Sequence, residues 1–378
     1  MKIFWCKTCL NMSTRPRIEF DQEGRCNACV WKDQKKNIDW TSRQLELTKL
    51  LAWSKEKSRS FDCIVPVSGG KDGSYVAYKL KHEYGMNPLC VTVRPPLALE
   101  LGEKNLNNFI DSGYSHIQIS PSSKAMRELN KYGFIDGGYP YLGWMIAIKT
   151  AVIKLAFQLN ISLIVYGEDG EIEYGGSTET KDRPTYDIEY MKRVYFQGAY
   201  EPLIEKVTQS GMFSLADLDF WNFPSDEEID GQQLKFTHFS YFEPWDSYRN
   251  YMIAKEHCGL QESDNNNVGT FTNFSQNDQA LATLHYYLMY LKFGFGRATQ
   301  DAGIEIRRGS MNREQALNLV KVYDNQYPSQ FIELYLEYYQ ITKIEFDQVL
   351  DSCVNKDLFE LVDNQWQPKF DVGMSLEL

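Results

Sequence analysis

The sequence lacks any apolar run long enough to cross a membrane. A spanning helix needs about 20 apolar residues in succession. The best candidate, Ile146 to Phe157, is shorter and carries Lys149 and Lys154. The first residues also contain no hydrophobic stretch of the kind found in secretory signals. We therefore expect a soluble, cytoplasmic protein.

Positive charge is also scarce. The chain has 40 lysine and arginine residues against 51 aspartate and glutamate residues, which gives a formal net charge of -11. This balance does not favour binding to a nucleic-acid backbone, although a local basic patch is compatible with it. Internal repeats and low-complexity tracts are absent from the sequence as well.

Apolar residues are plentiful enough for a large core. The chain has 378 residues, of which 43% are hydrophobic, and this predicts two domains or one domain with appendages. The composition changes after Lys235. We therefore divide the chain into a cysteine-containing ribbon (1–40), an α/β domain (41–235) and a mainly helical region that completes the substrate site (236–378).

Four cysteines near the N-terminus form two C-x2-C pairs, Cys6 with Cys9 and Cys26 with Cys29. Such pairs suit tetrahedral zinc, and four protein ligands leave no open position, so we expect a structural zinc ion. Two redox-active pairs are the main alternative. The remaining cysteines are scattered, and we expect them to be small buried hydrophobic residues: Cys63, Cys90, Cys258 and Cys353.

Short apolar runs alternate with helical patterns between residues 62 and 166. Strands are expected at 62–67, 88–93, 116–119 and 161–166, and helices at 75–84, 98–111, 123–132 and 144–159. This alternation predicts a parallel sheet covered by helices on both faces. Ligands of such sheets bind at the carboxyl ends of the strands. A charged helix within residues 41–60 is expected to link the ribbon to this domain.

The first strand runs into a glycine turn, Ser68-Gly69-Gly70-Lys71-Asp72-Gly73-Ser74. Glycines let a ligand approach the backbone closely, and the first amides of the following helix attract an anion. The hydroxyls and Lys71 add donors, and Asp72 can hold a magnesium ion that bridges phosphates. A Walker A loop is excluded, because Asp72 follows Lys71 and Val65 replaces the upstream glycine. An ordinary strand-to-helix turn is the alternative.

A group of carboxylates follows the fourth strand, at the same edge of the expected sheet. We assign Glu168 and Asp169 to function, because carboxylates directly after a buried strand can bind magnesium or orient a nucleophile. A solvated acidic loop is the alternative, and Glu171 and Glu173 fit either interpretation. Residues 170–235 are rich in Gly, Asp, Glu and Tyr, and they predict a substrate-facing insertion or a mobile lid.

The last third of the chain contains a basic segment within an acidic protein. Helices are expected at 245–257, 279–292 and 313–323, followed by a small helical bundle over 331–378. Arginine presents a planar fork to phosphate or carboxylate. We assign Lys292 and Arg297 to the binding of such an anion, and Arg307 and Arg308 are secondary candidates. The alternative is that these residues are surface cations paired with neighbouring acids. His285 is expected to be a core histidine.

The glycine turn resembles the pyrophosphate loop of the PP-loop ATP pyrophosphatases, although Gly73 is inserted before the final serine of the usual pattern. The order of motifs is more specific than the loop. The four-cysteine ribbon and this loop are followed by Tyr-Gly-Glu-Asp-Gly-Glu-Ile-Glu-Tyr-Gly-Gly at 166–176, Gly-Thr-Phe-Thr at 269–272 and Lys-Phe-Gly-Phe-Gly-Arg-Ala-Thr at 292–299. Over residues 1–325 this order is similar to that of the N-acetyl sugar amidotransferases of bacterial surface-polysaccharide and nonulosonic acid biosynthesis.

The resemblance implies a fold of the adenine nucleotide alpha hydrolase type and a ligase that uses ATP, Mg²⁺ and a structural Zn²⁺. Such an enzyme transfers AMP to the oxygen of a sugar acetamido group, and ammonia then replaces that oxygen. The products are an acetamidino sugar, AMP and pyrophosphate. Ammonia is expected from a partner glutaminase of the histidine-biosynthesis type, because no glutaminase signature is visible in this chain.

The resemblance also implies roles for particular residues. Asp72 would hold magnesium, Lys71 and Arg297 would offset charge on the phosphates, and Glu168 or Asp169 would bind a second magnesium or receive protons. The loop residues that would cradle pyrophosphate are Ser68, Gly69, Gly70, Lys71, Gly73 and Ser74. The nucleotide site would be completed by Val93, Gly167, Lys292 and Arg297, and contacts to the sugar would come from Tyr174, Thr270 and Arg307.

Two other functions are compatible with these motifs. A PP-loop enzyme that thiolates or amidates a tRNA base would share the ribbon, the loop and the adenylation step. The net charge of -11 and the lack of a sulfur-carrying cysteine motif near the loop argue against it. A non-catalytic module that binds nucleotide within an assembly is the second alternative.

Overall fold

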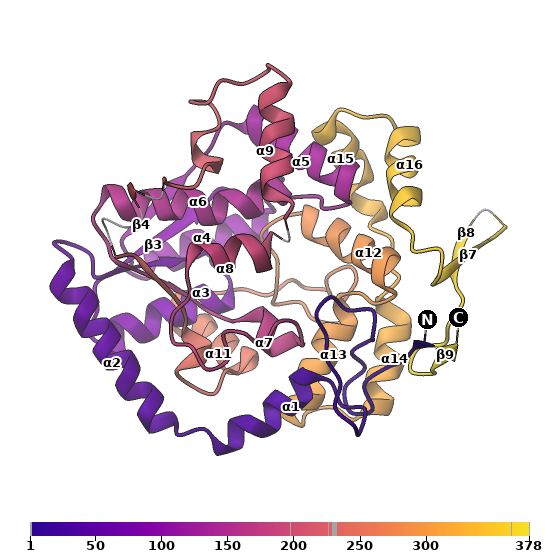
Figure 1. Ribbon diagram of the computed structural model, residues 1–378, viewed down its shortest axis with the longest axis horizontal. Coiled ribbons are helices and arrows are strands. Elements are labelled where there is room, and N and C mark those ends of the chain that lie inside the picture. Colours follow the sequence, from indigo (N-terminus) through magenta and orange to yellow (C-terminus); the bar gives the residue numbers. More distant parts are fainter. Residues whose placement is uncertain (1, 197, 226, 229–232, 364, 378) are drawn as a thin grey trace.

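A computed structural model describes residues 2–196, 198–225, 227–228, 233–363 and 365–377. Its centre is a sheet in the order β4-β3-β2-β5-β6, in which every neighbouring pair is parallel (Figure 1). The parallel sheet predicted from the sequence is therefore confirmed. The strands are β2 (Cys63–Pro66), β3 (Pro88–Val93), β4 (His116–Ile119), β5 (Leu163–Tyr166) and β6 (Lys235–His238). The sequence pattern did not reveal β6, which runs across the boundary expected at residue 235.

Helices cover both faces of the sheet, as the alternation of side chains along β2 requires. Ile64 packs with α5, α6 and α9 on one face, while Cys63 and Val65 pack with α2, α3, α4 and α11 on the other. Both faces are apolar, so the sheet is stabilised by burial on each side. These helices are α2 (Trp40–Lys57), α3 (Lys71–Tyr78), α4 (Glu100–Asp111), α5 (Ser123–Gly137), α6 (Leu142–Gln158), α9 (Tyr200–Gln209) and α11 (Ser247–Cys258).

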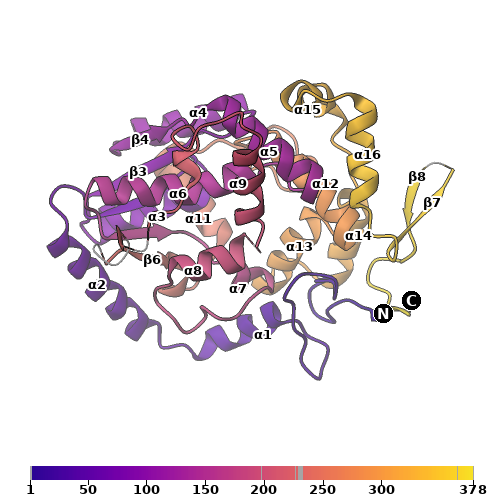
Figure 2. The same cartoon turned by 45° about the horizontal axis from the view of Figure 1, so that its top comes forward.

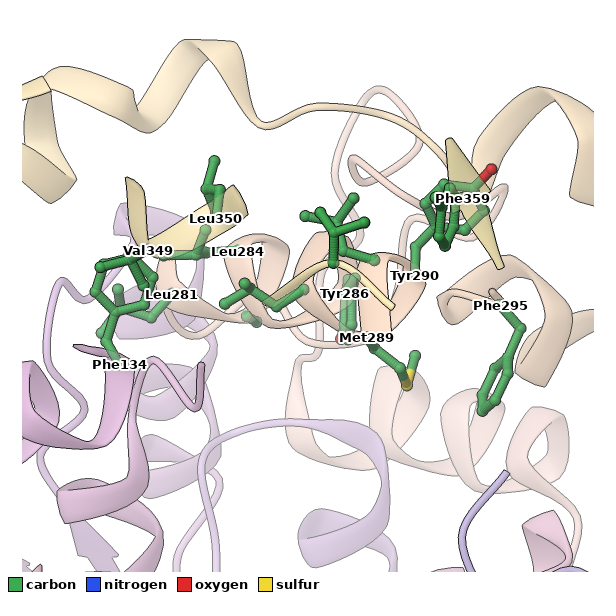
Figure 3. Close-up of a cluster of buried hydrophobic side chains, with 14 of the residues drawn as sticks. Phe134, Leu281, Leu284, Tyr286, Met289, Tyr290, Phe295, Val349, Leu350 and Phe359 are labelled. Atoms are coloured by element: carbon green, nitrogen blue, oxygen red, sulfur yellow. The ribbon is translucent and has the colours of Figure 1, made fainter. Parts of the chain in front are cut away.

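A second core surrounds α12, which is apolar on nearly all sides and therefore buried. Figure 3 shows Leu281 and Leu284 of α12 near Phe134 of α5 and Leu350 of α16, so α5 belongs to both cores. The helices of this region are α12 (Leu281–Phe293), α13 (Arg297–Arg308), α14 (Arg313–Tyr323), α15 (Ile332–Tyr339) and α16 (Lys343–Cys353). Two features differ from the expectation. The basic segment forms α13, and the predicted C-terminal bundle gives way after α16 to a hairpin of β7 (Phe359–Val362) and β8 (Gln365–Pro368).

The first and last strands of the described chain pair with each other. Strand β1 (Lys2–Ile3) pairs with β9 (Leu376–Glu377) in an antiparallel arrangement (Figure 2). The cysteine segment (residues 2–40) contains α1 (Asn27–Gln34), which packs against α7 (Gly170–Tyr174). The segment expected to be an insertion or lid thus begins with α7 and continues with α8 (Ile188–Tyr190) and α9. Short 3-10 or π-helical turns lie at Lys35–Asn37, Lys79–Glu83, Met191–Tyr195, Asp219–Trp221, Phe239–Tyr241 and Ser329–Phe331.

Within the described ranges, no helix combines the length and the apolar character that crossing a bilayer requires.

Candidate functional site

The glycine turn joins β2 to α3 in a form that only glycine fits. Gly69 has a φ of +77°, and a β-carbon there would lie 2.4 Å from the backbone nitrogen of Leu106. At Gly73 a β-carbon would lie 2.8 Å from the carbonyl oxygen of Pro66. The extra glycine of the motif therefore lets α3 start close against the end of β2. Gly70 precedes α3 without a side-chain cap, which leaves the first amides of the helix available to an anion.

This turn forms one wall of a cavity of about 410 Å³ at the carboxyl edge of the sheet, which we call the loop cavity. The opposite walls come from distant parts of the chain. Glu168 and Tyr174 follow β5, and Arg297 begins α13. The lining residues from the sequence prediction are Ser68, Gly70, Lys71, Asp72, Gly73, Glu168, Tyr174 and Arg297. The fold therefore brings the loop, one of the two assigned carboxylates and the favoured arginine to one place.

Charges of both signs face each other across the loop. Lys71 is buried and forms an ion pair with Asp72, whose other carboxylate oxygen accepts a hydrogen bond of 3.2 Å from the side-chain amide of Asn250. Burial raises the pKa of Glu168 to about 7. The negative charge of Asp72 adds to this effect, whereas Lys71 opposes it. Two carboxylates that repel each other through one cavity are typical of a site for a divalent cation, and oxygen ligands suit Mg²⁺.

Replacing Glu168 with Gln is expected to stabilise the protein at pH 8 by on the order of 2 kcal/mol. The pKa of Glu168 is higher in the folded than in the unfolded protein. Its favourable contribution to the free energy of unfolding is therefore fully present below about pH 4.5, where the carboxyl is protonated, and is lost as the pH rises to about 7. Glutamine has no charge to bury and can still accept the 2.6 Å hydrogen bond that the Tyr174 hydroxyl donates to Glu168. Thermal unfolding of both proteins between pH 4.5 and 8, without added magnesium, measures the difference. A constant difference across this range would contradict the buried-charge explanation.

Arg297 is held in place by a buried ion pair and the hydrogen bond behind it. Its guanidinium pairs with Asp301 at 2.8 Å, and the other oxygen of Asp301 accepts a hydrogen bond of 2.5 Å from the Thr270 hydroxyl. Burial disfavours the charged guanidinium, but the Asp301 carboxylate outweighs this effect and keeps the pKa of Arg297 above its usual value. Thr270, expected to contact a sugar, is itself buried behind this pair. Its place in the structure is that of a residue that positions Arg297.

Asp169 lies next to Glu168 in the sequence but faces the protein interior. Its carboxylate accepts hydrogen bonds from the Thr180 hydroxyl at 2.6 Å and from the backbone amide of Glu171, where it caps α7. Burial raises the pKa of Asp169 to about 6. His238 lies 3.6 Å away on its other side. The structure thus separates the two carboxylates that the sequence prediction treated alike.

Two assigned basic residues also lie outside the 410 Å³ cavity. The ammonium group of Lys292 donates to the carbonyl oxygens of Gly137 and Gly138. Arg307 donates to the carbonyl oxygen of Glu173 at 3.0 Å, and it lies close enough to the cysteine cluster to interact with its charge. Neither side chain shares the loop cavity with Arg297.

Two further assigned residues pack behind the cavity. The carbonyl oxygen of Val93 accepts a hydrogen bond of 3.1 Å from the indole of Trp144, and that ring lines the cavity. Gly167 is packed so tightly that a β-carbon there would lie 3.1 Å from the β-carbon of Asp72. Both residues support groups that reach the cavity.

Sequence reasoning missed several groups that line this cavity. They are aromatic residues at the start of α6 and polar residues of the loop before α12, and they include Tyr139, Tyr141, Trp144, Asn277, Asp278 and Gln279. The dense aromatic stretch Tyr139-Pro140-Tyr141-Leu142-Gly143-Trp144 was the available signal, because rings gathered before a helix can serve base or sugar stacking as well as core packing.

The four N-terminal cysteines converge on one point. Their sulfur atoms lie within 4.8 Å of one another and all four residues are buried. The sulfurs of Cys9 and Cys26 are 3.5 Å apart, and those of Cys6 and Cys29 are 3.9 Å apart. A tetrahedral zinc with bonds of about 2.3 Å would place its sulfurs about 3.8 Å apart. The arrangement fits one four-thiolate zinc site better than two separate redox pairs.

The cysteine segment also positions the residues that follow β5. Arg17 forms a two-pronged ion pair with Glu171, with bonds of 3.0 and 2.6 Å. Lys35 pairs with Glu173 at 2.5 Å. The amide of Asn11 donates to the carbonyl oxygen of Tyr174 at 2.9 Å. The two carboxylates that fitted either interpretation are thus structural contacts between this segment and α7, and Asn11 holds the backbone of Tyr174.

The C-terminal part of the chain matches the model of a known protein family. Residues 268–371 match the model of a family described as LPS biosynthesis protein WbpG-like, C-terminal domain. This segment contains α12 to α16 together with Thr270 and Arg297. The match supports a role in LPS biosynthesis and suggests an enzyme. No curated protein matches the chain.

Proposed function

We propose that this protein is an ATP-dependent N-acetyl sugar amidotransferase that acts in LPS, O-antigen or nonulosonic acid biosynthesis. It would convert a sugar acetamido group into an acetamidino group and release AMP and pyrophosphate. The observation that carries the proposal is the convergence of the glycine loop, Glu168 and Arg297 on one cavity, with Arg297 contributed by the segment that matches an LPS-biosynthesis family.

The loop cavity is proposed to bind ATP with its phosphates against residues 68–74. The free amides at the start of α3 and the positive charges of Lys71 and Arg297 suit the α- and β-phosphates. Asp72 would hold Mg²⁺, which would supply positive charge that neutralises phosphate oxygens. The rings of Tyr141 and Trp144 line the same cavity and suit a flat base.

The chemistry follows from the weakness of an amide as an electrophile. The acetamido oxygen attacks the α-phosphorus of ATP, pyrophosphate leaves, and the resulting O-adenylyl imidate has a good leaving group. Ammonia then attacks the imidate carbon, AMP departs, and the amidine remains. Lys71 and Arg297 stabilise charge that develops on the phosphates. Glu168, whose pKa of about 7 suits proton transfer near neutral pH, accepts a proton from the attacking nitrogen.

A separate cavity could bring ammonia to Glu168. A cavity of about 400 Å³ reaches Glu168 between α1, α11 and α13, and its lining includes Lys35, Trp245 and Arg307. Positive side chains repel ammonium but not ammonia. We propose that a partner glutaminase of the histidine-biosynthesis type delivers ammonia from this side. The cytoplasm, where ATP and glutamine are available, is the proposed compartment.

The division of the chain follows from these roles. Residues 1–40 would form the zinc-binding ribbon that positions Tyr174, and residues 41–235 most of the ATP pyrophosphatase domain. Residues 236–378 would add the rest of β6 and α11 to that domain and form the region that completes the substrate site. Arg297, Thr270 and Asp301 come from this last region.

The experiment combines purified protein with Mg-ATP, ammonium and a panel of N-acetylated sugars, and mass spectrometry follows the products. The proposal predicts AMP, pyrophosphate and exchange of one sugar oxygen for NH with a single member of the panel. AMP and pyrophosphate without a changed sugar would support the activation step and point to a missing acceptor or ammonia source. Turnover that requires tRNA would overturn the proposal in favour of the tRNA-modifying alternative.

A further inference from the structure

A second cavity of about 420 Å³ lies beside the loop cavity. It is formed by the turn after the first cysteine pair, the C-terminal end of α5, and α12 with the residues that follow it. Tyr139 lines both cavities. The rings of Phe293 and Phe295, which stack at a centroid distance of 6.0 Å, form part of its wall. Of the residues given a role from the sequence, only Lys292 lines this cavity, and it lies away from the glycine loop where its role was expected.

Three cations and the carboxylate of Glu171 line the second cavity, and two of the cations already have partners. Arg17 is paired with Glu171, and Lys292 donates to two backbone carbonyls. Arg15 differs: among the described residues its guanidinium forms no ion pair and no hydrogen bond. It lies 5.8 Å from the ring centroid of Phe295 and 5.9 Å from that of Tyr174. Burial lowers the pKa of Arg15 to about 10, so the side chain keeps its charge at neutral pH.

The Arg15 guanidinium is half-buried at the wall of this cavity, so an anionic ligand inside the cavity can form a charge-assisted contact with it. The rings around Arg15 add a flat apolar surface on which a ring can pack. The cavity therefore suits a molecule that joins an oxyanion to a ring.

Tyr174 connects this cavity to the proposed reaction site. The guanidinium groups of Arg15 and Arg297 each lie 5.9 Å from the centroid of its ring, one lining the second cavity and the other the loop cavity. The hydroxyl of Tyr174 donates to Glu168. A molecule bound to Arg15 would thus lie on one side of Tyr174, and Glu168 and Arg297 would face the nucleotide on its other side.

We propose that the second cavity binds the acidic part of the acceptor sugar, a phosphate or a carboxylate, with Arg15 as its ionic partner. That the bound molecule is the acceptor substrate rests on the proposed function, whereas the binding of an oxyanion at Arg15 does not. The acceptor is then an acidic sugar, and its acetamido group reaches the loop cavity past Tyr139 and Tyr174.

The test is equilibrium binding by calorimetry, which needs no turnover. Three probes are used: UDP-N-acetylglucosamine, which carries a diphosphate, N-acetylneuraminate, which carries a carboxylate, and neutral N-acetylglucosamine. The wild-type protein is expected to bind at least one acidic probe in the millimolar range or better, and the neutral sugar more weakly. The acidic probe that binds identifies the source of the oxyanion.

Arg15→Gln is expected to weaken that binding by about tenfold or more, because it removes a charge-assisted contact. Affinity for a non-hydrolysable ATP analogue should change less than about twofold, since Arg15 does not line the loop cavity. Arg25→Gln is the matched control, because Arg25 is paired with surface acids of the cysteine segment. It should leave both affinities unchanged.

Gly137→Phe tests the same cavity without removing a charge. Gly137 lines it, and a β-carbon at this position meets no atom within 4 Å, so a larger side chain can fill the space. It should also weaken the acidic probe. The inference is overturned if neither acidic probe binds the wild-type protein, or if folded Arg15→Gln binds it as well as wild type. Loss of acidic binding in Arg15→Gln, together with no AMP formation by the wild type, would leave the inference standing and reject the proposed function.

Discussion

Replacing Asp72 with Asn is expected to lower the release of AMP and pyrophosphate by 100-fold or more. The substitution keeps the shape of the side chain and the position that accepts from Asn250, but it removes the negative charge that pairs with Lys71 and would hold Mg²⁺. Loss of one group that stabilises charge in the transition state typically costs about 10²–10³ in rate. A coupled assay for pyrophosphate at saturating Mg-ATP measures the effect.

The protein should otherwise be intact. Asp72 lies at the surface of the cavity, with 30% of its side chain exposed, so the melting temperature should fall by no more than a few degrees. Asp111→Asn is the matched control, because Asp111 is exposed at the end of α4 and lies outside the cavity. It should retain full activity. If Asp72→Asn keeps more than half of the wild-type rate, the assignment of the loop to pyrophosphate is wrong.

Replacing Cys26 with Ser is expected to release zinc and to unfold the cysteine segment. Structural zinc contributes roughly 10–16 kcal/mol to the folding of small modules, which is as large as the whole stability of an ordinary domain, about 5–15 kcal/mol. Cys26 is central to the cluster, since its sulfur lies 3.5 Å from that of Cys9 and accepts a hydrogen bond from Asn11. Metal analysis should give one zinc per wild-type chain and well below half of that in the variant.

Activity should fall together with zinc. The segment holds Tyr174 through Asn11 and holds α7 through ion pairs with Glu171 and Glu173, so its loss releases residues of the proposed active site. Cys353→Ser is the control, because Cys353 is half-buried near Lys292 and is not part of the cluster. It should keep its zinc. A Cys26→Ser protein that retains zinc and normal activity would show that this cluster is not a structural metal site.

Local spacing was enough to predict much of the fold. Strands separated by helices gave the parallel sheet, and the two C-x2-C pairs gave the four-sulfur cluster, because each depends on residues close together in the chain. The fifth strand, β6, was missed because its pattern, Lys-Phe-Thr-His, contains no apolar run and resembles a loop. It forms by pairing with β5, a contact that the sequence does not display.

The position of the site residues was harder to predict. Glu168 and Asp169 are neighbours in the short link between β5 and α7, where the Thr180 hydroxyl and the Glu171 amide hold the carboxylate of Asp169 away from Glu168. One therefore faces the cavity and the other the interior. Arg297 and Arg307 lie on one helix, but ten residues of helix advance about 15 Å, so a single cavity cannot receive both. Lys292 lies in the last turn of α12, where its ammonium group donates hydrogen bonds to the carbonyl oxygens at the end of α5.

The sequence alone determined the elements whose chemistry is local: the glycine turn that leaves helix amides free, the four thiolates, and the apolar runs that became the sheet. Only the tertiary structure decided which side chains share a cavity. Asp72 accepts a hydrogen bond from Asn250. Asp301 pairs with Arg297 and accepts a hydrogen bond from Thr270. Arg15 lies beside the ring of Tyr174. Most of these contacts join residues far apart in the chain, so packing rather than spacing selects them.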